Sequence, residues 1–87
     1  MYSFDIKDHL DKALNKLSKK NPKQFEIILK KISEVIQNPH HYKNLRKPLQ
    51  HLRRVHIDKS FVLIFSVNKK EKRVLFEELD HHDRIYK

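Results

Sequence analysis

The chain has 87 residues, of which 20 are lysine or arginine and 11 are aspartate or glutamate, so its formal net charge is +9. A chain of this length holds one core, so we expect a single domain over residues 1–87, and the charge favours an anionic partner, most often nucleic acid. The sequence contains no cysteine and no glycine, which excludes disulfides, thiolate metal sites and glycine-rich phosphate loops and favours a cytoplasmic location.

The first half of the chain predicts one strand and two helices. Residues 2–7 alternate between apolar and polar side chains, which is typical of a half-buried strand. Asp8 then resembles a helix N-cap, and a second helix is expected between Asn21-Pro22 and Asn38-Pro39. The short connection between the helices predicts an antiparallel hairpin. The apolar stripes are Leu10, Leu14 and Leu17 in the first helix and Ile28, Leu29 and Ile32 in the second.

The second half predicts a basic loop and three strands. Residues 40–51 carry no hydrophobic period, and strands are expected at 52–58, 61–67 and 73–79. The middle strand is apolar on both faces and belongs at the centre of the sheet, and it is far too short to cross a membrane. The expected fold is therefore α+β in the order β-α-α-β-β-β. A helical hairpin packs on one face of a small antiparallel-rich sheet, and the other face stays partly open.

The first of the three strands carries a candidate catalytic residue. Alternation along the strand places Val55 and Ile57 on one face and Arg54 and His56 on the other. Cleavage of RNA without metal needs a base for the 2′-OH, an acid for the departing 5′-oxygen and positive charge on the phosphate. Histidine suits either proton role. The simpler alternative for His56 is an ordinary exposed strand residue.

The end of the chain brings further candidates. On extended backbone His81 and His82 point to opposite sides, so at most one of them joins His56. A zinc site at His81, His82 and Asp83 is disfavoured because adjacent histidines diverge and no cysteine assists, and we expect no metal or other cofactor. The Arg84 guanidinium can bind a phosphate through two parallel hydrogen bonds, although a solvated charge is the simpler interpretation.

Tyr86 and a set of basic side chains complete the candidates. Tyr86 can stack on a base or donate its phenol, and its simpler alternative is an aromatic ring that packs over the sheet edge. Lysines on the helices most often form a solvated face. The cations placed to track an RNA backbone are Lys43, Arg46, Lys47, Arg53, Arg54 and Lys59.

The element order, size and charge resemble the RelE/ParE superfamily of toxins from type II toxin–antitoxin operons, over essentially the whole chain. The resemblance is most specific at Pro48-Leu49-Gln50, from Arg53 to Phe65 and from His82 to Tyr86. Membership implies a RelE-like toxin that cleaves mRNA on the ribosome and inhibits translation. It also implies a cognate RelB-like antitoxin that silences the toxin in a hetero-oligomer.

Within that superfamily the histidine pattern resembles the YafQ-like branch. The resemblance implies catalytic roles for His56, His82 and Tyr86, with Arg84 supplying positive charge. His56 is the preferred base and His82 the preferred acid, and the two roles can be exchanged.

Two positions depart from the family patterns. RelE-like members usually carry an arginine where Val62 stands, and YafQ-like members an acid where Ser60 stands. The first departure removes a phosphate-binding cation, and Arg84 is a candidate to replace it. The second removes one group for proton handling or positioning.

Two other functions fit the same fold. One is a ParE-type inhibitor of DNA gyrase without nuclease activity, and the other is a non-catalytic RNA-binding module. The paired histidines favour the nuclease, because poisoning a topoisomerase needs no proton transfer.

Overall fold

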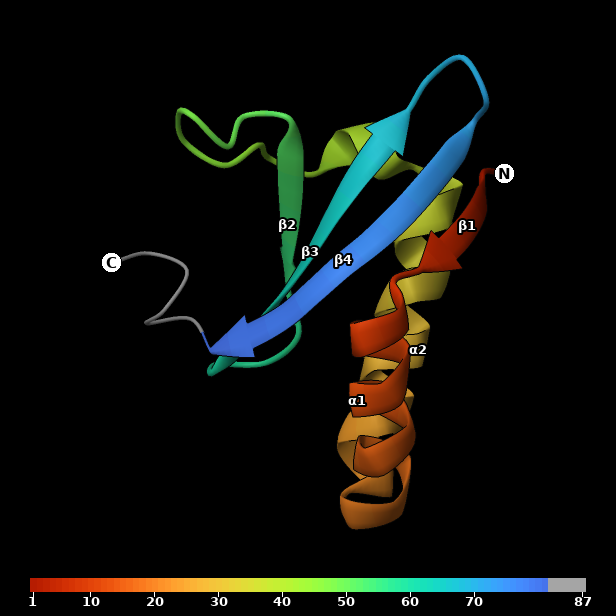
Figure 1. Ribbon diagram of the computed structural model, residues 1–87, viewed down its shortest axis with the longest axis vertical. Coiled ribbons are helices and arrows are strands. Elements are labelled where there is room, and N and C mark those ends of the chain that lie inside the picture. The colour runs from red at the N-terminus through yellow and green to blue at the C-terminus, as the bar shows by residue number, and fades with distance from the viewer. Residues whose placement is uncertain (82–87) are drawn as a thin grey trace.

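The computed structural model describes residues 1–81 and has the expected element order, with one short 3-10 helix in addition. The two helices lie side by side and run in opposite directions, as the hairpin prediction required (Figure 1). No helix in residues 1–81 is long and apolar enough to cross a membrane. The elements are β1 (Ser3–Ile6), α1 (Asp8–Lys20), α2 (Pro22–Gln37), η1 (Pro39–His41), β2 (Leu52–His56), β3 (Phe61–Asn68) and β4 (Arg73–His81).

The helix boundaries follow local capping chemistry. The Asn21 side chain caps α2 by accepting a hydrogen bond of 3.2 Å from the Gln24 backbone N–H, and Pro22 occupies the first turn. The prediction of Asp8 as the cap of α1 is wrong by one position, because Lys7 is the capping residue. Asp8 lies inside the first turn instead, where its charge is favourable to the helix dipole.

The strands form a four-stranded mixed sheet in the order β1-β4-β3-β2. β3 pairs antiparallel with β2 and β4, whereas β1 pairs with β4 in parallel. The central position of β3 explains why it is apolar on both faces. An ion pair of 2.9 Å between Asp5 and Arg73 ties β1 to β4 beside their backbone pairing.

The main core lies between the helices and one face of the sheet. It contains the residues predicted for the core in both helices, in β2 and β3 and at Ile57 just after β2, except for Leu17, which is partly buried, and Leu29, which is 46% exposed. Including Leu29 in the core was wrong because successive helix residues are about 100° apart, so that Leu29 turns away beside the fully buried Ile28. The buried core residues are Leu10, Leu14, Ile28, Ile32, Val35, Val55, Ile57, Leu63, Phe65, Val74 and Phe76.

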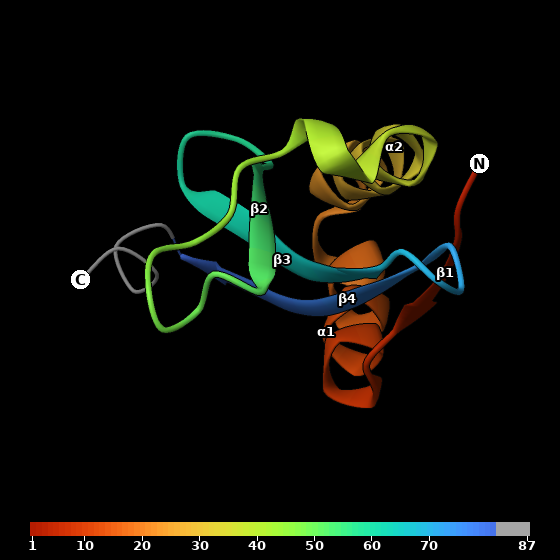
Figure 2. The same ribbon diagram turned by 90° about the horizontal axis from the view of Figure 1, so that it is seen from above.

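A smaller cluster covers the centre of the opposite face. Val62 and Ile64 of β3 are buried there beneath Leu45, with Leu52 packed alongside. The loop over residues 42–51 runs beside β2, as the view from above shows (Figure 2), and its Leu45 packs on Val62 and Ile64. Two backbone hydrogen bonds fix it: the Leu45 N–H donates to the Leu52 carbonyl over 2.9 Å, and the Arg54 N–H donates to the Lys43 carbonyl over 3.2 Å.

A β-bulge in β4 decides which side chains reach this second face. Ile64 pairs with Glu78 and Phe65 with Phe76, which leaves Glu77 as the extra residue. Burial alone would raise the pKa of Glu77, but hydrogen bonds from the Lys7 and Ser66 side chains outweigh it and hold the pKa below its usual value. The Lys7 ammonium lies 2.9 Å from the Glu77 carboxylate, so the bulge is tied to the start of α1.

Candidate functional site

His56 occupies the last residue of β2 and faces away from the helices. Val55 and Ile57, its neighbours in sequence, are buried in the main core, and His56 is exposed. This arrangement confirms the alternation read from the sequence and places the imidazole on the same face as Arg54. His56 is paired across the ladder with Val62.

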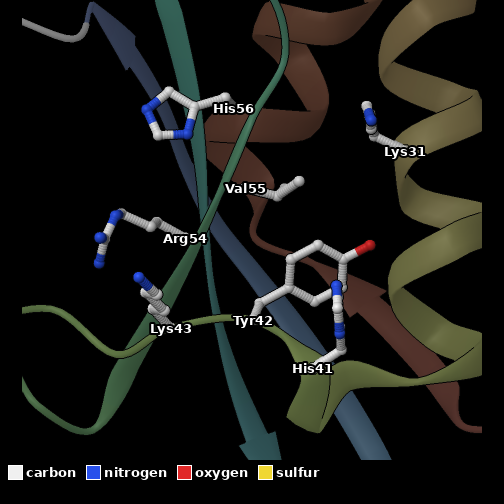
Figure 3. Close-up of a pocket in the computed structure, with 7 residues that line it drawn as sticks. All are labelled: Lys31, His41, Tyr42, Lys43, Arg54, Val55 and His56. Atoms are coloured by element: carbon white, nitrogen blue, oxygen red, sulfur yellow. The ribbon is translucent and has the colours of Figure 1, made fainter.

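Beside His56 lies an open hollow of about 510 Å³ that follows the outer edge of β2. The seven lining residues fall into two groups (Figure 3). His56, Arg54 and Lys43 point to one side of the strand, whereas the other residues lie on the side of α2. This second group is Lys31, His41, Tyr42 and Val55.

The two consecutive arginines of β2 have different surroundings. The Arg54 guanidinium borders the hollow and donates a hydrogen bond of 2.8 Å to the Asn44 carbonyl. Arg53 points to the helix side, where its guanidinium is partly buried and donates to the Tyr42 carbonyl over 2.7 Å. Arg54 is therefore placed at the candidate site, and Arg53 ties the loop to the strand.

A turn centred on Asp58 fixes the end of β2. The predicted strand was too long by two residues, because the Asp58 carboxylate accepts hydrogen bonds from the backbone N–H groups of Ser60 and Phe61 and so closes the turn. The Gln24 side chain of α2 donates a third, over 3.0 Å. The Ser60 N–H contributes most to lowering the pKa of Asp58, against the raising effect of burial.

The remaining predicted RNA contacts are spread over two loops. Lys43 lines the hollow. Arg46 and Lys47 are exposed in the loop before β2, and Lys59 is exposed in the turn after it, and none of these three lines the hollow. The predicted catalytic residues His82, Arg84 and Tyr86 lie outside the described residues.

Sequence reasoning missed the helix-side wall of the hollow. Lys31 belongs to the helix lysines that were expected to form a solvated face, and His41 and Tyr42 belong to the segment that was expected to be a basic loop. The adjacent histidine and tyrosine after Pro39 were the available signal. Their rings pack edge to face, with centroids 5.2 Å apart and an interplanar angle of 83°.

Asp80 was missed as well. It pairs with Val62, the same residue that pairs with His56, so the Asp80 and His56 side chains project from one face of the sheet. The position that is usually arginine in RelE-like proteins is filled here by the fully buried Val62. Among residues 1–81 no group of three or more His, Cys, Asp or Glu side chains is arranged to hold a metal ion.

Two helices packed on a four-stranded mixed sheet, with basic side chains along an edge strand, define a small α+β protein with the RelE-like fold. The model of the family described as the ParE toxin of type II toxin–antitoxin systems matches residues 2–86. The chain therefore belongs to the RelE/ParE superfamily and is a RelE-like toxin of a toxin–antitoxin system.

Individual relatives agree with this assignment. A protein of Methanocaldococcus jannaschii that carries the toxin name RelE4 is 59% identical over 87 residues, which span 100% of this chain and 93% of that protein. The crystal structure of YafQ from Escherichia coli is 17% identical, with a TM-score of 0.73 over 100% of both chains. A chain of the toxin–antitoxin complex RelBE2 from Mycobacterium tuberculosis is 17% identical, with a TM-score of 0.77 over 93% of this chain and 98% of that one. The two structures support the fold, and the sequence matches support the family.

Proposed function

We propose that this toxin is a ribosome-dependent mRNA endoribonuclease that inhibits translation by metal-independent acid–base cleavage. The observation that carries the proposal is the exposed His56 imidazole beside a hollow bordered by Arg54 and Lys43. An imidazole held next to fixed cations is the combination that phosphodiester cleavage without metal requires. The formal net charge of +9 favours binding to RNA over a wide surface.

In this mechanism His56 takes the proton of the ribose 2′-OH, whose oxygen attacks the adjacent phosphorus. The bond from phosphorus to the 5′-oxygen breaks, and His82 donates a proton to that oxygen. Arg84 stabilises the additional negative charge of the transition state, and Tyr86 orients the base or the phosphate. The products are a 2′,3′-cyclic phosphate and a free 5′-OH, and the two histidine roles can be exchanged.

Single-turnover cleavage of ribosome-bound mRNA tests the proposal. His56→Ala and His82→Ala should each slow cleavage by about 10²–10⁴-fold, because each removes a proton-transfer group. Lys12→Ala on α1 removes an exposed charge from an element remote from β2 and should cleave at the wild-type rate. Normal cleavage by both histidine variants, or loss of wild-type cleavage on metal chelation, would overturn the mechanism.

A second candidate is favoured by the family match itself, since the matching family is that of the ParE toxin. A ParE-type toxin would block DNA gyrase without cutting RNA. Supercoiling by purified gyrase in the presence of the toxin separates the two, because a nuclease leaves supercoiling unchanged. RNA binding with neither activity would instead indicate the non-catalytic module.

We also propose that a cognate RelB-like antitoxin binds and silences this chain in a cytoplasmic hetero-oligomer. Support comes from the similarity to a chain of the RelBE2 toxin–antitoxin complex. Expression of the toxin alone should arrest growth, and co-expression of the neighbouring small open reading frame should relieve the arrest. Harmless expression of the intact chain alone would contradict this proposal.

A further inference from the structure

The helix-side half of the hollow has no part in the acid–base chemistry proposed above. Its wall contains an aromatic pair, His41 and Tyr42. The Tyr42 ring packs edge to face with the buried Phe65, with centroids 5.8 Å apart and an interplanar angle of 85°, and it also packs edge to face with the ring of His41. The Tyr42 carbonyl is held by Arg53. His41 itself is exposed, so a flat ring can approach it from solvent.

The charges of this half suit an anion next to that ring. Lys31 projects from α2 on the side of the strand where Tyr42 and His41 lie, whereas Lys43 lies on the other side (Figure 3). Lys31 has one nearby acid, Glu34, at 3.8 Å, which is longer than the roughly 2.7–2.9 Å of a strong charge-assisted hydrogen bond. Since the Lys31 and Glu34 side chains are 34% and 45% exposed, an incoming anion can replace this loose pair.

The Tyr42 phenol adds a hydrogen-bond donor. Burial, followed by the Glu34 carboxylate, raises the pKa of Tyr42, so its hydroxyl stays protonated at neutral pH. In Figure 3 this hydroxyl points toward α2, into the same half of the hollow as the Lys31 side chain. A donor, a cation and an exposed ring therefore gather in one place.

We propose that the helix-side half of the hollow binds the RNA nucleotide adjoining the bond that is cut beside His56. Its base stacks on His41, and its phosphate lies beside Lys31 and the Tyr42 hydroxyl. Single-stranded RNA is recognised in this way by stacking rings and backbone-tracking cations. The volume of about 510 Å³ belongs to the whole open hollow, of which this half is one part. The inference rests on the proposed ribonuclease function and extends it from the cut phosphate to a neighbouring subsite.

The test is the affinity of the intact toxin for short oligoribonucleotides whose scissile 2′-OH is methylated, measured by fluorescence anisotropy at two salt concentrations. Each oligonucleotide is compared with versions extended by one nucleotide at the 5′ or the 3′ end. One of the two extensions should tighten binding to the wild type. His41→Ala should weaken binding of that extended oligonucleotide by roughly 5- to 100-fold and should leave binding of the shorter one unchanged. Lys31→Ala should weaken binding several-fold and reduce the logarithmic salt slope by about 0.7, the contribution of one phosphate on a single strand.

Glu34→Gln should change the affinity for RNA in the opposite direction to Lys31→Ala. The substitution removes the acid that competes with RNA for Lys31, so RNA binding should tighten. If the Lys31–Glu34 ion pair had only a structural role, Lys31→Ala and Glu34→Gln would change RNA affinity in the same direction. Lys30→Ala, an exposed neighbour on α2 outside the hollow lining, is the control and should stay within about twofold of the wild type.

The outcomes separate this inference from the proposed nuclease. Wild-type cleavage of ribosome-bound mRNA with unchanged binding by His41→Ala and Lys31→Ala would overturn the subsite alone. Binding that follows the predicted pattern without any wild-type cleavage would overturn the nuclease and leave the hollow as an RNA-binding site. Displacement of the oligonucleotide by hexaglutamate at lower concentration than by unlabelled RNA would show a site for acidic protein and would overturn the subsite as well.

Discussion

His56 and Asp80 project from the same face of the sheet and are separated by one residue, Val62, with which each of them pairs. Val62 is fully buried at 0% exposure, in a cluster with Ile64 and Leu45. The position between the two polar side chains thus serves packing and carries no cation. The cations that border the hollow on the side of His56 are Arg54 and Lys43.

Val62→Ala tests this packing role. The substitution should lower the free energy of unfolding by roughly 1–3 kcal/mol, because it removes buried methyl groups and leaves a cavity beneath Leu45. Urea denaturation gives the value. Val67→Ala in the same strand, where the side chain is only half-buried, is the matched control and should cost less. Equal effects of the two substitutions would contradict the importance of the Leu45 cluster.

Arg53→Met tests the tie between β2 and the loop. The substitution keeps an unbranched side chain but removes the partly buried hydrogen bond to the Tyr42 carbonyl, and it should cost about 1–3 kcal/mol of stability. Arg46→Met removes the same charge from an exposed loop position and should leave stability nearly unchanged. The melting temperatures of the two variants test this prediction. Equal melting temperatures would show that the Arg53 hydrogen bond does not stabilise the contact between β2 and the loop.

The Asp58 turn predicts a pH dependence. Because the folded protein lowers the pKa of Asp58, chiefly through the Ser60 N–H, its contribution to stability is present above about pH 4 and is lost as the pH falls through the folded value. At pH 7 Asp58→Ala should cost about 0.5–1 kcal/mol, a modest figure because the carboxylate is exposed.

Urea denaturation between pH 2.5 and 7 measures this dependence. The difference in the free energy of unfolding between the wild type and Asp58→Ala should become smaller below about pH 4. Asp58→Asn keeps an acceptor oxygen and should cost less at pH 7. A gap that stays constant with pH would assign the stabilisation to something other than the charged carboxylate.

Local sequence signals determine most of this fold. The Asn21-Pro22 start and the Asn38-Pro39 stop of α2 are visible because capping depends on neighbouring residues. The central place of β3 follows from its apolar faces. The face of Asp80 could not be predicted in this way. Val74 and Phe76 face the helices, and simple alternation along β4 would place Asp80 on that side as well. The bulge at Glu77 instead turns Asp80 to the face of His56.

The hollow was invisible from the sequence for a different reason. Its helix-side wall combines Lys31 of α2 with His41 at the end of η1, Tyr42 directly after it, and Val55 of β2. None of these segments carries a motif by itself, and only tertiary packing brings them together. His56 was predictable because period-two alternation along a single strand is enough to identify its face.

The loop segment 43–45 also bears on how molecules of this toxin meet one another. Asn44 forms a bridge with Arg53, and the flanking backbone groups of Lys43 and Leu45 bond to Arg54 and Leu52. A strand that ends a sheet normally offers its amides and carbonyls to any extended chain, which is a common route to aggregation. Here the backbone of residues 43–45 pairs with the outer side of β2 at residues 52–54. Breaking this pairing, for example with proline at position 45, would remove the Leu45 amide donor and open the edge to strand addition by a second copy.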